Sequence, residues 1–269
     1  MSTLMSPSNI LRTLIACSVC LIGTSLFAQD WTRFRGANGV GRADTCTVPL
    51  PWQEQDIAWK KELPGIGNSS PIVWGSHIYL MSADPKTATR YLLCQDLSTG
   101  DDVWQHEIQS SPYHLHARSS FASTTACANA SAVYFAWATP DNVTLRAFSH
   151  TGSEIWTRNL GRYVSQHGFG ASPCLVGNKL ILFNSQAAME LPEGVEPGQS
   201  KVMAFEAQTG EPIWETNLIT TRACYGTPTA FTDVSGKQAL LFANTGNGIF
   251  AVSIEDGEIL WNTEVFTKR

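Results

Sequence analysis

The chain has 269 residues, a formal net charge of −5, 43% hydrophobic residues and 15% charged residues. This is the composition of an ordinary globular protein with a low charge density. Because the chain is acidic and carries no basic stripe that could neutralise phosphates, the sequence argues against a nucleic-acid partner.

Residues 1–28 are predicted to be a secretory signal peptide. Arg12 gives a weakly positive start, residues 14–27 form an apolar stretch, and Ala28 precedes polar residues. The stretch is short for a membrane-spanning helix, so we expect no transmembrane span after signal removal. The expected location is exported, either periplasmic or associated with the cell envelope. In the alternative reading, residues 14–17 are a lipoprotein cleavage box and Cys17 carries a lipid anchor, but the apolar run continues well past that position.

A short phrase recurs four times in the rest of the chain, each time with a glycine four residues before a tryptophan. Its copies end at Trp104, Trp156, Trp214 and Trp261. The four glycines lie 52, 58 and 47 residues apart, which is the period range of stacked or radial repeats. Trp59 is interpreted as a fifth, degenerate copy that lacks its glycine.

Each phrase follows three apolar runs that are rich in β-branched and aromatic residues. In the first unit these runs span 71–74, 77–81 and 91–97, and a fourth run, 103–108, follows the glycine. In the third unit the runs are 173–176, 180–183, 202–205 and 213–218. Short apolar runs separated by Gly, Asn, Asp and Ser are typical of strands joined by tight turns. Each unit is therefore predicted to be a four-stranded antiparallel meander.

The repeats predict an all-β protein, a β-propeller of about four four-stranded antiparallel blades with little helix. A single meander cannot bury both of its faces, so the copies must pack on one another. A single β-sandwich is the alternative, but it does not explain the recurring tryptophan. The expected organisation is a signal peptide at 1–28, a lead-in segment at 29–56 and propeller repeats at 57–269.

Two copies of the phrase resemble the pyrroloquinoline quinone (PQQ) repeat. They are residues 96–104, which read Asp-Leu-Ser-Thr-Gly before ending in Trp104, and residues 207–214, which read Ala-Gln-Thr-Gly before ending in Trp214. Residues 31–36 and 68–71 are similar to exported PQQ-like propellers of environmental bacteria, and the resemblance spans about 31–265. WD-repeat and kelch propellers match less well, because neither a Trp-Asp dipeptide nor a paired-glycine strand recurs. The resemblance implies a tryptophan-docking motif, in which the indoles dock on the next blade as structural residues: Trp59, Trp104, Trp156, Trp214 and Trp261.

Four units do not determine how the propeller closes into a ring. Propellers of this family usually close with seven or eight blades, and many use an N-terminal strand to complete the last one. Residues 57–63 are expected to form such a strand. Three readings of the four units follow: a truncated gene product of a seven- or eight-bladed propeller, a native open arc, or a dimer that closes eight blades.

Loops between successive units supply the candidate ligand site. In a propeller the loops 65–70, 110–123, 161–172 and 219–227 would gather at one end of the central channel, a usual place for a ligand. Ordinary solvated loop residues are the alternative reading. Histidine and arginine would favour an anionic or carbonyl-bearing group, with affinity rising as the pH falls through the histidine range. The candidate residues of this axial mouth are Asn68, His116, Arg118, His167, Arg222 and Tyr225.

A metal site is considered and not favoured. His114 and His116 would lie on one face of an extended segment, and His167 could add a third ligand. No carboxylate or cysteine accompanies them at a known spacing, so we expect no metal. The cysteines that remain after signal removal show no CxxC pattern and are expected to be buried small apolar residues rather than a disulfide framework: Cys46, Cys94, Cys127, Cys174 and Cys224.

Two classes of function follow from these observations. Quinoprotein dehydrogenases of the resembled family hold PQQ over calcium with an aspartate base, and many carry two adjacent cysteines. This chain has no Cys-Cys pair, no CxxCH motif and no common hydrolase or nucleotide-binding signature. The favoured reading is a non-catalytic exported scaffold that binds a protein or a small ligand, without a cofactor, similar to the outer-membrane assembly lipoprotein of that family. The alternative is a PQQ-dependent oxidoreductase, or a truncated remnant of one, that binds PQQ with calcium.

Overall fold

The computed structural model describes residues 30–43 and 49–265. The predicted signal peptide, Cys17 and Cys46 lie outside these residues. No helix within the described ranges is long and apolar enough to cross a membrane.

Sixteen strands form four sheets, and each sheet has four antiparallel strands in chain order. Blade 1 consists of β1 (Ile72–Trp74), β2 (His77–Ala83), β3 (Arg90–Asp96) and β4 (Asp102–Ile108). Blade 2 consists of β5 (Cys127–Ala128), β6 (Val133–Ala138), β7 (Val143–Phe148) and β8 (Glu154–Asn159). Blade 3 consists of β9 (Cys174–Val176), β10 (Lys179–Asn184), β11 (Ser200–Glu206) and β12 (Pro212–Leu218). Blade 4 consists of β13 (Thr229–Thr232), β14 (Gln238–Asn244), β15 (Gly248–Ser253) and β16 (Ile259–Thr263).

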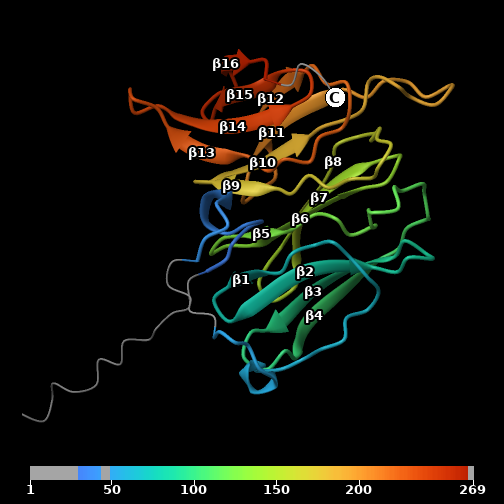
Figure 1. Ribbon diagram of the computed structural model, residues 1–269, viewed down its shortest axis with the longest axis vertical. Helices are drawn as coiled ribbons and strands as arrows, with labels where there is room; N and C mark the ends of the chain where they lie inside the picture. Colours follow the sequence, from blue (N-terminus) through green and yellow to red (C-terminus); the bar gives the residue numbers. More distant parts are fainter. Residues whose placement is uncertain (1–29, 44–48, 266–269) are drawn as a thin grey trace, which may run out of the picture.

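The prediction of an all-β protein with four-stranded antiparallel blades is confirmed. The only helices among the described residues are two 3-10 turns, η1 (Ala37–Gly39) and η2 (Glu54–Asp56). The blades stack in chain order, from β1–β4 at one end to β13–β16 at the other (Figure 1).

Stacking explains the different patterns of the inner and outer strands. The middle strands of blades 2 and 3 lie between two other blades, so both of their faces are buried, as in β6, where every residue is buried. Outer strands such as β4 and β8 alternate between exposed and more buried residues. Three apolar clusters fill the gaps between successive blades, and each draws its members from two neighbouring sheets. These clusters are the hydrophobic core.

The glycine of the repeated phrase and the tryptophan of the preceding blade form one contact. Gly210 has a φ of 69°, a conformation that favours glycine, and a Cβ there would lie 2.6 Å from the Trp156 ring. The indole N–H of Trp156 donates to the carbonyl of Ala207, at 3.0 Å. The same arrangement joins three more pairs: Trp59 with Gly100, Trp104 with Gly152, and Trp214 with Gly257. Trp156 is 9% exposed and Trp261 is 43% exposed.

Residues 57–63 do not form the strand that the sequence led us to expect. They lie at the blade 1 end of the stack, far from β16 (Figure 1). A strand requires a neighbouring strand for its hydrogen bonds, and none of the described strands pairs with this segment. The segment is held by side chains instead: Trp59 donates to the carbonyl of Leu97, and Lys61 pairs with Asp102 at 2.9 Å.

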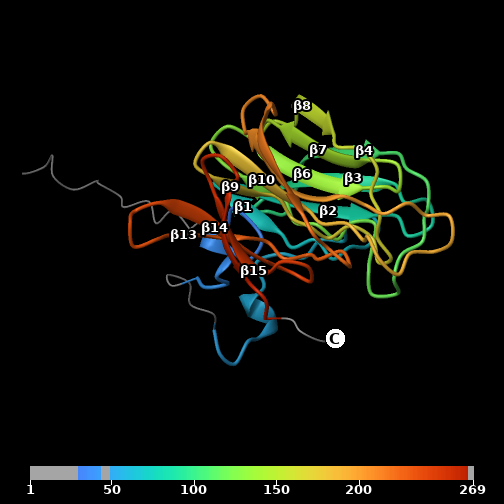
Figure 2. The same cartoon turned by 90° about the horizontal axis from the view of Figure 1, so that it is seen from above.

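Residues 30–39, which we call the N-terminal strap, cross the inner strands of several blades. Trp31 exchanges two backbone hydrogen bonds with Val73 of β1, and the carbonyl of Thr32 accepts from Ala128 of β5. The Asn38 side chain both donates to and accepts from the backbone of Ala230 in β13, at 2.7 and 2.8 Å. The strap therefore joins blades 1, 2 and 4, and Figure 2 shows its blue ribbon next to β1 and β13.

Candidate functional site

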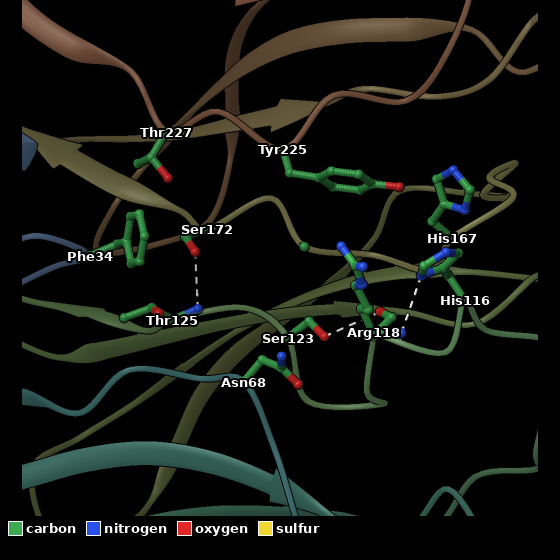
Figure 3. Close-up of a pocket in the computed structure, with 13 residues that line it drawn as sticks. Phe34, Asn68, His116, Arg118, Ser123, Thr125, His167, Ser172, Tyr225 and Thr227 are labelled. Atoms are coloured by element: carbon green, nitrogen blue, oxygen red, sulfur yellow. Dashed lines mark hydrogen bonds between the residues drawn. The ribbon is translucent and has the colours of Figure 1, made fainter.

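The loops between blades bring five of the six predicted site residues to one cleft. This axial cleft has a volume of about 450 Å³, and Phe34 of the strap also lines it. In Figure 3, Phe34 lies at one end, His116 and His167 lie at the other, and Arg118 and Tyr225 lie between them. The predicted residues that line the cleft are Asn68, His116, Arg118, His167 and Tyr225.

Hydroxyl groups at the start of the inner strands link three blades beside the cleft. The backbone N–H of Ser70 donates to the hydroxyl of Thr125, at 3.0 Å. The N–H of Thr125 in turn donates to the hydroxyl of Ser172, again at 3.0 Å. These positions are equivalent in blades 1, 2 and 3. These hydroxyl groups thus satisfy backbone donors of the neighbouring blade and fix the cleft wall.

Two histidines from different blades meet at one end of the cleft. The rings of His116 and His167 lie 5.0 Å apart between centroids, in an edge-to-face arrangement at 79°. The backbone N–H of Arg118 donates to Nδ1 of His116, at 3.1 Å. Nδ1 is therefore an acceptor, and in the neutral ring the proton resides on Nε2. His116 thus offers an N–H donor to the cleft even without a positive charge.

Arg118 supplies an unpaired positive charge. Its guanidinium makes no hydrogen bond or ion pair with any described residue, and the side chain lies in the centre of the cleft (Figure 3). None of the cleft-lining residues is an aspartate or a glutamate. The cleft therefore has a net positive character and can neutralise an anionic group.

The structure does not bring Arg222 together with the other predicted site residues. Arg222 does not line the axial cleft, and its guanidinium forms an ion pair with Glu190. Glu190 belongs to the long hairpin between β10 and β11. The two loops meet, and the opposite charges hold Arg222 outside the cleft.

Tyr225 contributes a neutral hydroxyl. Its oxygen lies 3.0 Å from the hydroxyl of Ser165, and its ring lies against Gly170. Burial raises the pKa of Tyr225 above its usual value. The phenol therefore stays protonated near neutral pH and can donate a hydrogen bond.

The structure separates the histidines that were considered together as metal ligands. His116 and His167 line the axial cleft, whereas His114 lines a neighbouring cleft together with Asp141 and Tyr163. Residues 111–116 are not a strand, so the two-residue spacing does not bring both imidazoles to one site. In the part of the chain that the structure describes, no group of three or more His, Cys, Asp or Glu side chains could hold a metal ion.

Comparison with known proteins gives one family and several relatives. Residues 141–266 match the family model described as outer membrane protein assembly factor BamB. The chain is 27% identical over 215 residues to tetrathionate hydrolase of Acidithiobacillus ferrooxidans, which covers 75% of this chain and 38% of the hydrolase.

Solved structures show the same fold. BamB from Moraxella catarrhalis matches with a TM-score of 0.51 and 17% identity, over 76% of this chain and 54% of that one. A quinohemoprotein alcohol dehydrogenase from Pseudomonas putida HK5 matches with a TM-score of 0.56 and 15% identity, over 88% of this chain and 40% of that one. The chain thus spans between 38% and 54% of the length of these three relatives.

Four stacked four-stranded blades with a recurring glycine–tryptophan contact define a β-propeller protein. Its repeated phrase resembles the PQQ repeat, and residues 141–266, slightly less than half of the chain, match the BamB family model.

Proposed function

We propose that this chain is a non-catalytic, exported scaffold that binds an anionic group of a protein or small ligand in the axial cleft. The observation that carries the proposal is the unpaired guanidinium of Arg118. It lies beside two imidazoles in a cleft whose lining contains no carboxylate. Arginine is well suited to carboxylates and other oxyanions, because its planar fork donates two parallel hydrogen bonds.

The family description supports a scaffold in the cell envelope. The matched model is described as an assembly factor of outer membrane proteins, which is a role in protein assembly rather than in chemistry. The arrangement of the cleft agrees with binding: it offers donors from Arg118, His116 and Tyr225. An anionic ligand would accept hydrogen bonds from these donors, and no covalent bond would be made or broken.

A sulfur oxyanion is the second candidate ligand. The relative of Acidithiobacillus ferrooxidans is named a tetrathionate hydrolase, and tetrathionate is a dianion that a positive cleft would attract. The observation that favours this candidate is again Arg118 with its two neighbouring imidazoles. Tetrathionate is therefore a useful probe together with a dicarboxylate such as succinate.

PQQ with calcium is the alternative cofactor, and it fits the cleft poorly. Calcium takes six to eight oxygen ligands, commonly including aspartate or glutamate carboxylates. The axial cleft presents nitrogen donors and hydroxyls instead, so its residues do not form a calcium cage. The fold similarity to the quinohemoprotein alcohol dehydrogenase keeps this alternative worth testing.

Calorimetric titration of the purified chain with succinate and with tetrathionate tests the proposal. Binding that is lost in Arg118→Ala and kept in Arg222→Ala would support the axial cleft. Equal binding by the wild-type chain and by Arg118→Ala would contradict it.

A further inference from the structure

A second groove lies between the outer parts of blades 2 and 3, away from the axial cleft. Its volume is about 660 Å³, and residues of β8, β10, β11 and β12 line it. Leu160 and Met203 give the groove an apolar part, and Arg162 and Lys201 give it a polar part. This size is within the usual range of ligand sites. We call it the blade 2–3 groove.

One buried polar atom in this groove lacks a partner. Asn184, the last residue of β10, lines the groove and is 2% exposed. Its side-chain oxygen Oδ1 is buried and accepts no hydrogen bond from the described residues. Leaving such a group unsatisfied is unfavourable, so native structures rarely do so without a reason.

The equivalent residues in the gaps on either side, between blades 1 and 2 and between blades 3 and 4, differ from Asn184. One fills its gap with a large side chain, and the other has hydrogen-bond partners for its side-chain oxygen. The strand registers align Asn184 with Trp137 of blade 2 and Asn244 of blade 4. Trp137 fills its gap and is 4% exposed, with the Arg146 guanidinium 5.3 Å from the ring centroid. Asn244 Oδ1 accepts from the N–H groups of Gly246 and Asn247, at 3.0 and 2.5 Å. Among these three positions, Asn184 alone combines an open groove with an unpaired acceptor.

The charges along the groove leave one cation without a carboxylate. Lys201 pairs with Glu215 at 2.7 Å, and Arg158 pairs with Glu211. Among the described residues, the Arg162 guanidinium donates only to the backbone carbonyls of residues 196 and 197, at 3.2 and 3.1 Å. The groove can therefore accept one negative charge near Arg162.

We propose that the blade 2–3 groove binds an extended peptide segment that carries an acidic side chain. The carboxamide of Asn184 has one acceptor and two donors, which complement the N–H and C=O of a peptide group. A peptide N–H donates to Oδ1 of Asn184, an acidic side chain pairs with Arg162, and apolar atoms contact Met203. β8 is the outermost strand of its sheet, so its free edge can also pair with an extended chain.

The test uses the full chain and a defined probe, a capped Ala-Ala-Asp-Ala-Ala peptide, with binding followed by NMR. We expect the peptide to shift the side-chain amide signal of Asn184, and the Asp-to-Asn version of the peptide to bind more weakly. Asn184→Leu should reduce the affinity about tenfold, because a peptide donor then lacks its acceptor. Arg118→Ala, which alters only the axial cleft, should leave this binding unchanged, so the two proposals fail separately.

The thermal stabilities of two Asn→Leu variants provide a second test that does not depend on tight binding. Replacing an unpaired buried acceptor by an apolar group of similar shape is close to neutral, so Asn184→Leu should not lower the thermal midpoint. Asn244→Leu removes an acceptor that two backbone donors use and should lower it. If Asn184→Leu destabilises the fold as much as Asn244→Leu, the oxygen has a structural partner such as a buried water, and the proposal is wrong. A probe peptide at millimolar concentration that shifts no signal of the groove would also overturn it.

Discussion

The Trp156 ring lies on Gly210 of the next blade, and its N–H donates to Ala207 of that same blade at 3.0 Å. This relationship explains why the glycine and the tryptophan recur together in the sequence. Each glycine turn receives the indole of the blade before it, while the tryptophan that follows it in sequence contacts the blade after it. Each copy of the phrase therefore takes part in two contacts: its glycine receives the tryptophan of the preceding blade, and its tryptophan packs on the following blade.

Gly210→Ala should destabilise the protein by roughly 2–4 kcal/mol. The added Cβ would meet the Trp156 ring at 2.6 Å, and the left-handed backbone adds its own cost. Gly177→Ala is the matched control, because Gly177 also has a positive φ of 59° but nothing lies within 4 Å of its Cβ. Its cost should be only about 1–2 kcal/mol. Denaturant unfolding of both variants measures the difference, and equal losses would contradict the contact.

Trp156→Ala should cost about 3–5 kcal/mol, as for other large truncations in a core. Trp261→Ala should cost clearly less, because Trp261 is 43% exposed whereas Trp156 is 9% exposed. The comparison needs the same unfolding assay for both variants. A larger loss at Trp261 would mean that its ring is covered in solution.

Arg118→Ala should weaken anion binding in the axial cleft about tenfold, the usual effect of losing one charge-assisted hydrogen bond. Arg222→Ala removes the same charge from a neighbouring loop and should have little effect, since Arg222 pairs with Glu190. Titration of succinate into the wild-type chain and both variants measures the effect, and equal losses in the two variants would contradict the role of Arg118.

Stability should fall in acid below about pH 4, where the turn aspartates become protonated. The hydroxyl and N–H of Ser98 and the N–H of Thr99 donate to Asp96 and hold its pKa below the usual value. A lowered folded pKa means that the stabilisation is complete above the unfolded pKa and is lost as the pH falls through the folded one. Asp84, Asp233 and Asp256 have pKa values shifted in the same direction.

Asp96→Asn isolates one of these contributions. Asparagine keeps an acceptor but has no charge to lose, so the thermal midpoint of the variant should depend less on pH between about 5 and 3. Thermal unfolding of both proteins across that range measures the difference. Identical pH profiles would show that Asp96 contributes nothing to the acid sensitivity.

Purified protein with added PQQ and calcium should not reduce an artificial electron acceptor with alcohols or sugars. The reason is the donor set of the axial cleft, which contains no carboxylate for calcium. Absorbance spectra with and without calcium provide the measurement. Calcium-dependent dye reduction would instead favour the oxidoreductase alternative.

The repeat allowed the blades to be predicted because the relevant information is local. Strand runs such as 77–81 and 180–183 lie within the observed β2 and β10, and turn glycines mark the change from one strand to the next. The loops of equivalent units must also emerge on the same side, which is why five cleft residues were found from their position in the repeat.

Other features depend on contacts that no local pattern reveals. Arg222 was misplaced because its partner, Glu190, belongs to an insertion in another blade. The strand expected at 57–63 was inferred from how related propellers close, and its structure here is set by Trp59 and Lys61 on blade 1. Asn184 gave no signal, because an unpaired oxygen is visible only when all neighbours are in place.

The strap makes contacts between parts of the chain that are far apart in sequence. Asn38 and Ala230 are 192 residues apart in sequence yet exchange two hydrogen bonds. Contacts of such high sequence separation form late, because the entropy of closing the loop must be overcome before they add stability. The strap can therefore dock fully only after blade 4 has folded onto the stack. During synthesis residues 30–39 therefore cannot make all of their contacts until blade 4 has been made, so strap docking reports that blade 4 has packed onto the stack.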